Sequence, residues 1–146
     1  VPLNDADAAG ITEVAYGAAK DAKGVVVFTT QGTGIGSAII VDGRLMTNTE
    51  LGHLELDGHD AEKRASSGQK TLQGLDWAQW AERLQRYYSH VEMLLSPDLF
   101  VVGGGVSENA DKFMPLLKLR TPMIPAKLLN TAGIVGAAYY AANHQG

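Results

Sequence analysis

Apolar residues recur at helical spacing in four segments of this chain. The first segment runs from Asn4 or Asp5, residue types that favour a helix N-cap, to Lys20. The longest begins at Asp76, is supported by a capping-box pattern, and ends before Pro97. The other two segments cover residues 110–117 and 133–143. This pattern predicts four helices.

Short runs rich in β-branched and aromatic residues indicate strands between these helices, because such side chains pack well on a pleated sheet. The expected strands cover residues 25–30, 37–41, 44–46 and 99–102. The pair Asp42-Gly43 is typical of a two-residue hairpin turn, so the first three strands are expected to be antiparallel.

Residues 47–71 are polar and have no clear periodicity. We interpret this segment as a functional loop with a short helix near residues 61–66. Trp77 and Trp80 repeat at helical spacing with other apolar residues, which favours a place in the core over a ligand platform.

The order of the elements argues for an α/β domain. A chain of 146 residues with 45% hydrophobic content can bury one sizeable core but is short for two. We therefore expect a single domain over residues 1–146.

Composition excludes several kinds of function. The formal net charge is -4 and no run of like charges is present, which argues against nucleic acid as a partner. There is no cysteine, so disulfides and thiolate chemistry are excluded. No apolar stretch reaches about 18 residues, so no membrane span is expected, and a cytoplasmic enzyme fits this composition.

Two glycine-rich turns follow expected strands, where backbone N–H groups can approach an anion closely. The first is Gly32-Thr33-Gly34-Ile35-Gly36, which lacks both the dinucleotide spacing and the Walker lysine. It suits a phosphate group, although a glycine-rich hairpin turn explains it equally well. The second is Gly103-Gly104-Gly105, which taken alone favours a closely packed strand-to-helix turn.

Acidic residues and histidines gather in the polar segment. Their density suits a polyhydroxylated ligand or a divalent metal, whereas a solvated loop remains the stronger explanation for Glu55, Asp57 and His59. Asp5 by itself is explained by helix capping. The cations Lys63, Arg64, Lys70, Arg83 and Arg86 could attract a polyanion, or could simply be solvated surface.

Taken together and in order, four motifs resemble those of the ROK family of sugar kinases, and within it the branch that uses polyphosphate. They are Asn4-Asp5-Ala6-Asp7-Ala8-Ala9-Gly10, the Gly32–Ser37 turn, Glu50-Leu51-Gly52-His53, and the strand that leads into Gly103–Gly105. The resemblance covers nearly the whole chain. It implies the C-terminal domain of a ribonuclease H-like, actin-like ATPase fold, with a mixed sheet flanked by helices.

The resemblance also implies roles for individual residues. Asp5 would be the general base on the 6-hydroxyl of glucose, and Asn4, Glu50, His53 and Glu62 would hold the sugar. The phosphoryl donor, polyphosphate or ATP, would bind at Gly32, Thr33, Gly34, Gly36 and Gly103–Gly105. Mg²⁺ would be shared between donor phosphates and water, with no metal site formed by the protein.

Two departures from the family pattern carry further expectations. Asp57-Gly58-His59-Asp60 stands where many members have a cysteine-rich zinc site, which makes His53 a sugar ligand. The N-terminal lobe with its Asp-Ile-Gly-Gly-Thr motif is absent, so the isolated chain is expected to be inactive. Self-association as a homodimer would be one way to cover the apolar surface of such a lobe.

One alternative comes from the same resemblance. The family includes transcriptional repressors, so the chain could be a non-catalytic sugar-sensing domain, although the retained Asp5 and the Gly32–Gly36 turn argue against this. A nicotinamide-dependent enzyme is disfavoured further, because no glycine-rich turn leads into a helix with the required spacing.

Overall fold

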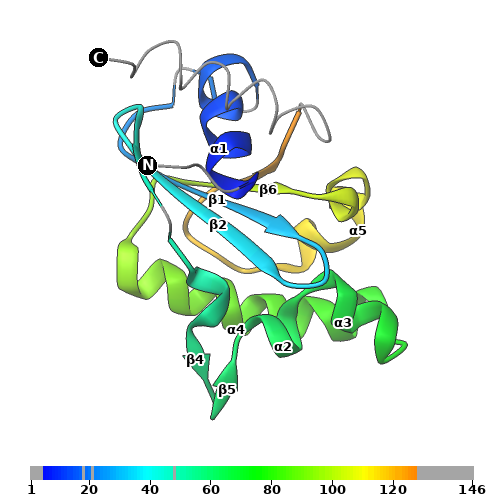
Figure 1. Cartoon of the computed structure of the whole chain (residues 1–146). Coiled ribbons are helices and arrows are strands. Elements are labelled where there is room, and N and C mark those ends of the chain that lie inside the picture. The colour runs from blue at the N-terminus through cyan, green and yellow to red at the C-terminus, as the bar shows by residue number, and fades with distance from the viewer. Residues whose placement is uncertain (1–4, 18, 21, 48, 128–146) are drawn as a thin grey trace.

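A five-stranded mixed sheet forms the framework of the protein (Figure 1). The computed structural model describes residues 5–17, 19–20, 22–47 and 49–127. The sheet has the order β3-β2-β1-β6-β7. Its strands are β1 (Val25–Gln31), β2 (Ile35–Val41), β3 (Arg44–Met46), β6 (Leu99–Gly103) and β7 (Met123–Pro125).

Strand directions divide this sheet into two parts. β1, β2 and β3 are antiparallel, as expected, whereas β6 pairs in parallel with β1 and β7 in parallel with β6. The hairpin turn has φ values of 49° at Asp42 and 81° at Gly43, as a two-residue turn with left-handed positions requires. β7 was not predicted, because three residues that include a proline carry no periodic signal.

Helices cover both faces of the sheet (Figure 1). α1 (Asp5–Tyr16) lies on one face and α4 (Trp77–Leu95) on the other. The first helix is shorter than predicted, because α1 ends at Tyr16 and the prediction ended at Lys20. The mixed sheet flanked by helices confirms the predicted fold class.

Side chains of successive strand residues divide between two hydrophobic clusters, because they point to opposite faces of the sheet. Val27, Phe100 and Val102 pack in the cluster that contains Trp80 and Leu84 of α4. Phe28, Val101, Ala38 and Ile40 pack in the other cluster, together with Ala9 of α1. Burial on both faces explains why β1 and β6 read as continuous apolar runs rather than alternating ones.

α4 begins as its sequence predicts. Asp76 accepts a hydrogen bond from the backbone N–H of Gln79 at 2.7 Å, and the Gln79 side chain accepts one from the backbone N–H of Asp76 at 2.9 Å. The helix ends at Ser96, whose φ of 43° is left-handed. Trp80 is fully buried and Trp77 packs against the same cluster, which confirms that both tryptophans belong to the core.

The polar segment after β3 holds more structure than predicted. It contains a 3-10 turn η1 (Leu51–His53), the hairpin β4 (Glu55–Leu56) and β5 (His59–Asp60), and the helices α2 (Glu62–Ala65) and α3 (Ser67–Leu72). The short helix near residues 61–66 is confirmed. The loop prediction was wrong for much of the rest, because elements of two to six residues are too short to show a period.

The segment after β6 is only partly helical. η2 (Gly105–Asn109) leads into α5 (Ala110–Phe113), and η3 (Met114–Leu116) follows. The helix predicted over residues 110–117 thus tightens into a 3-10 turn at Pro115, which has no N–H for an α-helical bond. The helix predicted at residues 133–143 lies outside the described residues. Within the described part of the chain, no helix is long and apolar enough to cross a membrane.

The start of α4 offers a test of the fold. Replacing Asp76 with alanine removes a cap from the longest helix and is expected to lower the free energy of unfolding by about 1 kcal/mol. Denaturant titration measures this change. Asp111→Ala, at an exposed aspartate of α5, is the control and should change the free energy much less. Equal effects of the two variants would contradict the capping role.

Candidate functional site

The two glycine-rich turns meet at one edge of the sheet. β1 and β6 are parallel neighbours in which Thr30 pairs with Gly103. The turns that follow the two strands therefore leave the sheet side by side. Gly104 has a φ of 94°, and a side chain there would collide with the backbone of Gln31. Close packing therefore accounts for Gly104, as the sequence favoured when this turn was taken alone.

The first turn lines a cavity of about 290 Å³, here called the glycine pocket. It is lined by Thr30, the Gly32–Gly36 turn and Glu62. The turn is closed by a hydrogen bond of 3.0 Å from the N–H of Gly32 to the carbonyl of Gly34. Gly32 and Thr33 are exposed. This edge can therefore present backbone amides and a hydroxyl to an anionic group.

Contacts from two helices hold the turn from outside. The N–H of Gly68 donates to the carbonyl of Gly32 at 2.8 Å, and the N–H of Ser67 donates to the Gln31 side chain at 3.1 Å. Gln31 in turn donates to the hydroxyl of Tyr88 at 3.3 Å. Burial raises the pKa of Tyr88, so its hydroxyl stays protonated at neutral pH. The turn is thus fixed to α3 and to the core of α4.

The Glu50–His53 motif is fixed against the start of β2. The Ser37 hydroxyl accepts a hydrogen bond from the N–H of Leu51 at 3.0 Å. Gly52 is buried, and a side chain there would meet the carbonyl of Ile35 and, at 2.7 Å, the Glu62 carboxylate. Only glycine allows this close approach. It places η1 beside the first residue of α2.

His53 lies among three carboxylates. Its Nδ1 is 3.1 Å from Asp60 Oδ2 and 4.0 Å from Glu62 Oε1, and its Nε2 is 3.9 Å from Glu50 Oε2. The pKa of His53 is raised, first by the hydrogen bond to Asp60 and then by the charge of Glu62. Carboxylates and an imidazole in this arrangement can accept and donate hydrogen bonds to the hydroxyls of a sugar.

The structure thus brings together three of the predicted sugar-binding residues, Glu50, His53 and Glu62, next to the glycine pocket. Sequence reasoning missed Asp60 as a member of this cluster. Its place two residues before Glu62, in the same acidic segment, was the available signal. Pairing with His53 follows from the β4–β5 hairpin, which brings Asp60 back towards η1.

The start of α1 lies at the same edge. A side chain atom on Gly36 would be 3.2 Å from Cβ of Ala6, so the first turn of the helix packs directly on the start of β2. Asp5 is the first residue of that helix. The predicted ligand Asn4 lies outside the described residues.

Other acidic and histidine residues of the segment lie elsewhere. Asp57 pairs with Arg86 at 3.2 Å, and both Asp57 and His59 line a different pocket. Glu55 is exposed. Among the residues that the structure describes, no group of three or more His, Cys, Asp or Glu side chains is placed to hold a metal ion.

The His53 cluster gives a prediction about charge. Asp60→Asn removes the largest cause of the raised pKa, so the pKa of His53 should fall towards its ordinary value and more of the ring should be neutral at a given pH. NMR titration of the His53 ring resonances, assigned with a His53→Gln variant, measures this.

Asp57→Asn is the matched control, since Asp57 pairs with Arg86 and is not among the causes of the His53 shift. It should leave the His53 titration where it is. An unchanged midpoint in Asp60→Asn would contradict the pairing.

Comparisons with known proteins agree with this geometry. The profile of the ROK family matches residues 2–74. A polyphosphate glucokinase of Mycobacterium tuberculosis is 54% identical over 136 residues, which cover 93% of this chain and 51% of that protein. The chain spans about half the length of the curated relatives it matches.

Two solved structures share the fold. The inorganic polyphosphate/ATP-glucomannokinase from Arthrobacter sp. strain KM superposes with a TM-score of 0.94 at 57% identity, over 98% of this chain and 56% of that one. A ROK family glucokinase from Streptomyces griseus, solved with glucose and AMPPNP, superposes with a TM-score of 0.81 at 22% identity, over 98% of this chain and 68% of that one. The second likeness concerns the fold alone. With its family motifs gathered at one edge of the sheet and its first half matched by the family profile, this chain belongs to the ROK family.

Proposed function

We propose that this chain is the C-terminal lobe of a phosphotransferase that transfers a phosphoryl group from polyphosphate, with ATP as a second donor, to the 6-hydroxyl of glucose. The observation that carries this proposal is the meeting of the glycine pocket with Glu50, His53 and Glu62, at the edge where α1 begins. Relatives at 54% and 57% identity are a polyphosphate glucokinase and an inorganic polyphosphate/ATP-glucomannokinase, which supports this donor and acceptor.

Asp5 is the proposed general base. Phosphoryl transfer to an alcohol needs a carboxylate near the attacking hydroxyl, and Asp5 opens the helix that packs beside the glycine turn. In the proposed step, Asp5 takes the proton of the glucose 6-hydroxyl as its oxygen forms a bond to the terminal phosphorus. The bond from that phosphorus to the rest of the donor breaks, and the shortened donor leaves with the electron pair.

The sugar is held by Asn4, Glu50, His53 and Glu62. Asp60 keeps the His53 ring in one orientation through the 3.1 Å contact, as a polar partner does for many functional histidines. Fixing several hydroxyls in this way orients the 6-hydroxyl and lowers the entropic part of the barrier.

The donor is placed at the glycine turns. Amides of Thr33, Gly34 and Gly36, with the Thr33 hydroxyl, would stabilise charge on the transferring group. The N–H of Gly32 already donates to the carbonyl of Gly34, so Gly32 would contribute by leaving room for the donor. Gly103–Gly105, on the adjacent strand end, would approach the remainder of the donor. The turn itself carries no charged side chain, and the Glu62 carboxylate lines the same pocket, so the phosphate chain would arrive with Mg²⁺, which when bound neutralises part of the phosphate charge.

The base assignment has a direct test in the protein that contains this chain. Asp5→Asn should lower kcat for glucose phosphorylation with polyphosphate by about 10²–10⁴-fold, because the carboxylate acts on the proton rather than in binding. The KM for glucose should change little. Steady-state kinetics with both donors measure these values.

Asp111→Asn, at an exposed residue of α5, is the control and should keep the original kcat. Original turnover in Asp5→Asn would remove Asp5 as the base. Loss of activity in both variants would point to a change in folding and would contradict a specific role for Asp5.

A second prediction concerns the chain on its own. Closure of two lobes around the donor is part of the proposed mechanism, so residues 1–146 alone should phosphorylate glucose no faster than the background of the full-length Asp5→Asn protein. Circular dichroism verifies that the isolated chain folds. Robust turnover by the folded isolated chain would refute the two-lobe requirement.

A further inference from the structure

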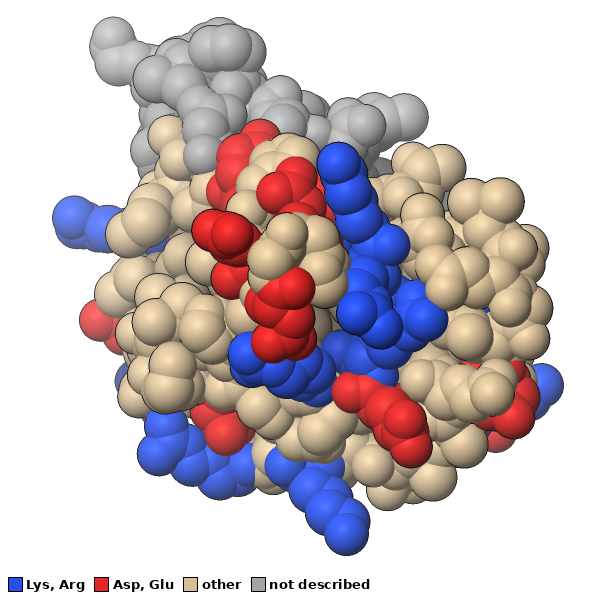
Figure 2. Space-filling view, turned by 90° about the horizontal axis from the view of Figure 1, so that it is seen from below, with Lys and Arg blue, Asp and Glu red and all other residues tan. Residues whose placement is uncertain are grey.

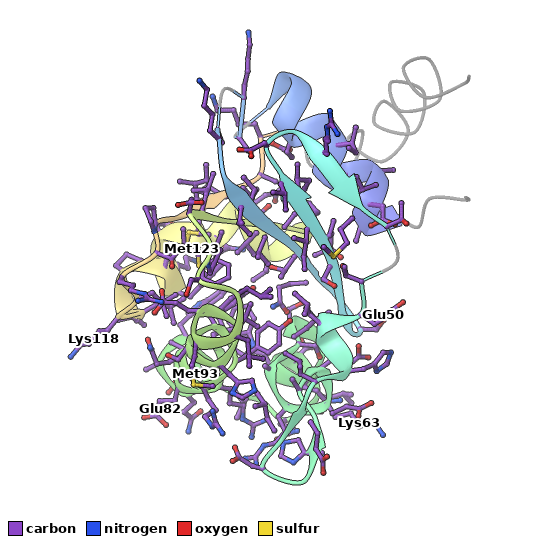
Figure 3. All side chains as sticks on the ribbon, turned by 90° about the vertical axis from the view of Figure 1, so that its left-hand side faces the viewer. Glu50, Lys63, Glu82, Met93, Lys118 and Met123 are labelled. Carbon is purple, nitrogen blue, oxygen red and sulfur yellow. The ribbon has the colours of Figure 1, made fainter. Side chains whose placement is uncertain are left out.

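A second pocket of about 410 Å³ lies below the sheet, between the β4–β5 hairpin, α2 and α4. We call it the arginine pocket, because Arg64, Arg83 and Arg86 line it. Figure 2 views the molecule from this side and shows Lys and Arg side chains gathered near the middle of the face, beside a column of Asp and Glu. In Figure 3, Glu82, which lines the arginine pocket, and Glu50 of the sugar site lie on opposite sides of the molecule.

Arg83 is held in place without being neutralised. Its guanidinium donates to the backbone carbonyl of Arg64 at 3.1 Å and to the side-chain carbonyl of Gln73 at 2.9 Å. Both acceptors are uncharged. Within the described ranges, no carboxylate forms an ion pair with Arg83 or Arg64. Two guanidinium groups of this pocket thus keep their charge available for a ligand.

The third arginine is paired. Arg86 contacts Asp57 through two hydrogen bonds of 3.2 and 3.3 Å, and this contact lowers the pKa of Asp57. Glu82 is the second carboxylate of the lining. Three arginines therefore face two carboxylates, which leaves an excess of positive charge before His59 is considered.

Tyr87 also lines the pocket, but its hydroxyl is enclosed. Tyr87 is fully buried, and its hydroxyl has no hydrogen-bond partner among the described residues. Burial raises the pKa of Tyr87 well above its usual value, so the group remains a donor. Because this hydroxyl is enclosed, it is not counted among the groups that would bind a ligand in the pocket.

We propose that the arginine pocket binds a phosphoryl group, with Arg64 and Arg83 as its charge partners. Guanidinium groups match phosphate oxygens in geometry and charge. The pocket is larger than one phosphate, so the group is part of a larger ligand, either a phosphate chain or a phosphate monoester of a sugar. This site is distinct from the glycine pocket and goes beyond the proposed function, although α2 contributes Glu62 to one and Arg64 to the other.

Isothermal titration calorimetry on the protein that contains this chain tests the proposal with three probes: inorganic phosphate, tripolyphosphate and glucose 6-phosphate. Arg64→Gln combined with Arg83→Gln should weaken one binding event by about tenfold or more for at least one probe, since each bond to a charged group contributes strongly. Lys63→Ala is the matched control, because Lys63 is an exposed cation of the same helix that does not line the pocket.

The probes separate the two sources of the group. Weakening with tripolyphosphate alone identifies a phosphate chain, and weakening with glucose 6-phosphate alone identifies a monoester. If the double variant binds all three probes as Lys63→Ala does, the pocket is not a phosphoryl site.

This result is independent of the proposed reaction. Binding at the arginine pocket is measured as a separate event, without turnover. The proposed function is tested instead by the kinetics of Asp5→Asn. Should the double variant fold poorly by circular dichroism, Arg64→Gln alone replaces it, since within the described residues Arg64 accepts a hydrogen bond through its backbone carbonyl and makes none through its side chain. Arg64→Gln must then weaken the same binding event for the proposal to hold.

Discussion

The parallel pairing of β1 with β6 is the constraint on which the site depends. Both strands are buried on both faces, so their register is fixed by which side chains enter which cluster. A slip of one residue would move Phe100 or Val101 to the wrong face. The register that satisfies the core also sets Thr30 opposite Gly103, and this places the two glycine turns at one edge.

The glycine turn itself has few internal contacts, and its shape comes from its surroundings. Gly68 and Ser67 hold it from α3, while Gln31 connects it through Tyr88 to the interior of α4. These bonds lie partly in the low-dielectric core, where satisfied polar groups make a structure rigid. In the proposed function, a turn held in this way would present its amides to a phosphate in a geometry fixed before binding, which is the condition for effective electrostatic stabilisation.

α2 has an unusual position for a helix of four residues. Glu62 faces the glycine pocket and the His53 cluster, whereas Arg64 and Ala65 face the arginine pocket. Glu62 and Arg64 of one short helix thus line different pockets. Adjacent positions on a short helix point in different directions, so few residues can serve two sites.

Elements with local signals could be predicted from the amino-acid sequence. The Asp42-Gly43 turn, the capped start of α4 at Asp76 and the apolar runs of β1 and β6 depend on neighbouring residues, and the structure has them where they were predicted. The order of the family motifs likewise predicted that Glu50, His53 and Glu62 belong to one site. Their roles came from the resemblance, because composition and spacing alone explain each of them as surface.

The remaining features depend on contacts between distant parts of the chain. The pairing of Asp60 with His53, the close approach that requires Gly52, the parallel addition of β7 and the meeting of three arginines at one pocket all join segments that are separate in the sequence. Such contacts follow from how strands and helices pack, so the periodicity of a single segment cannot predict them.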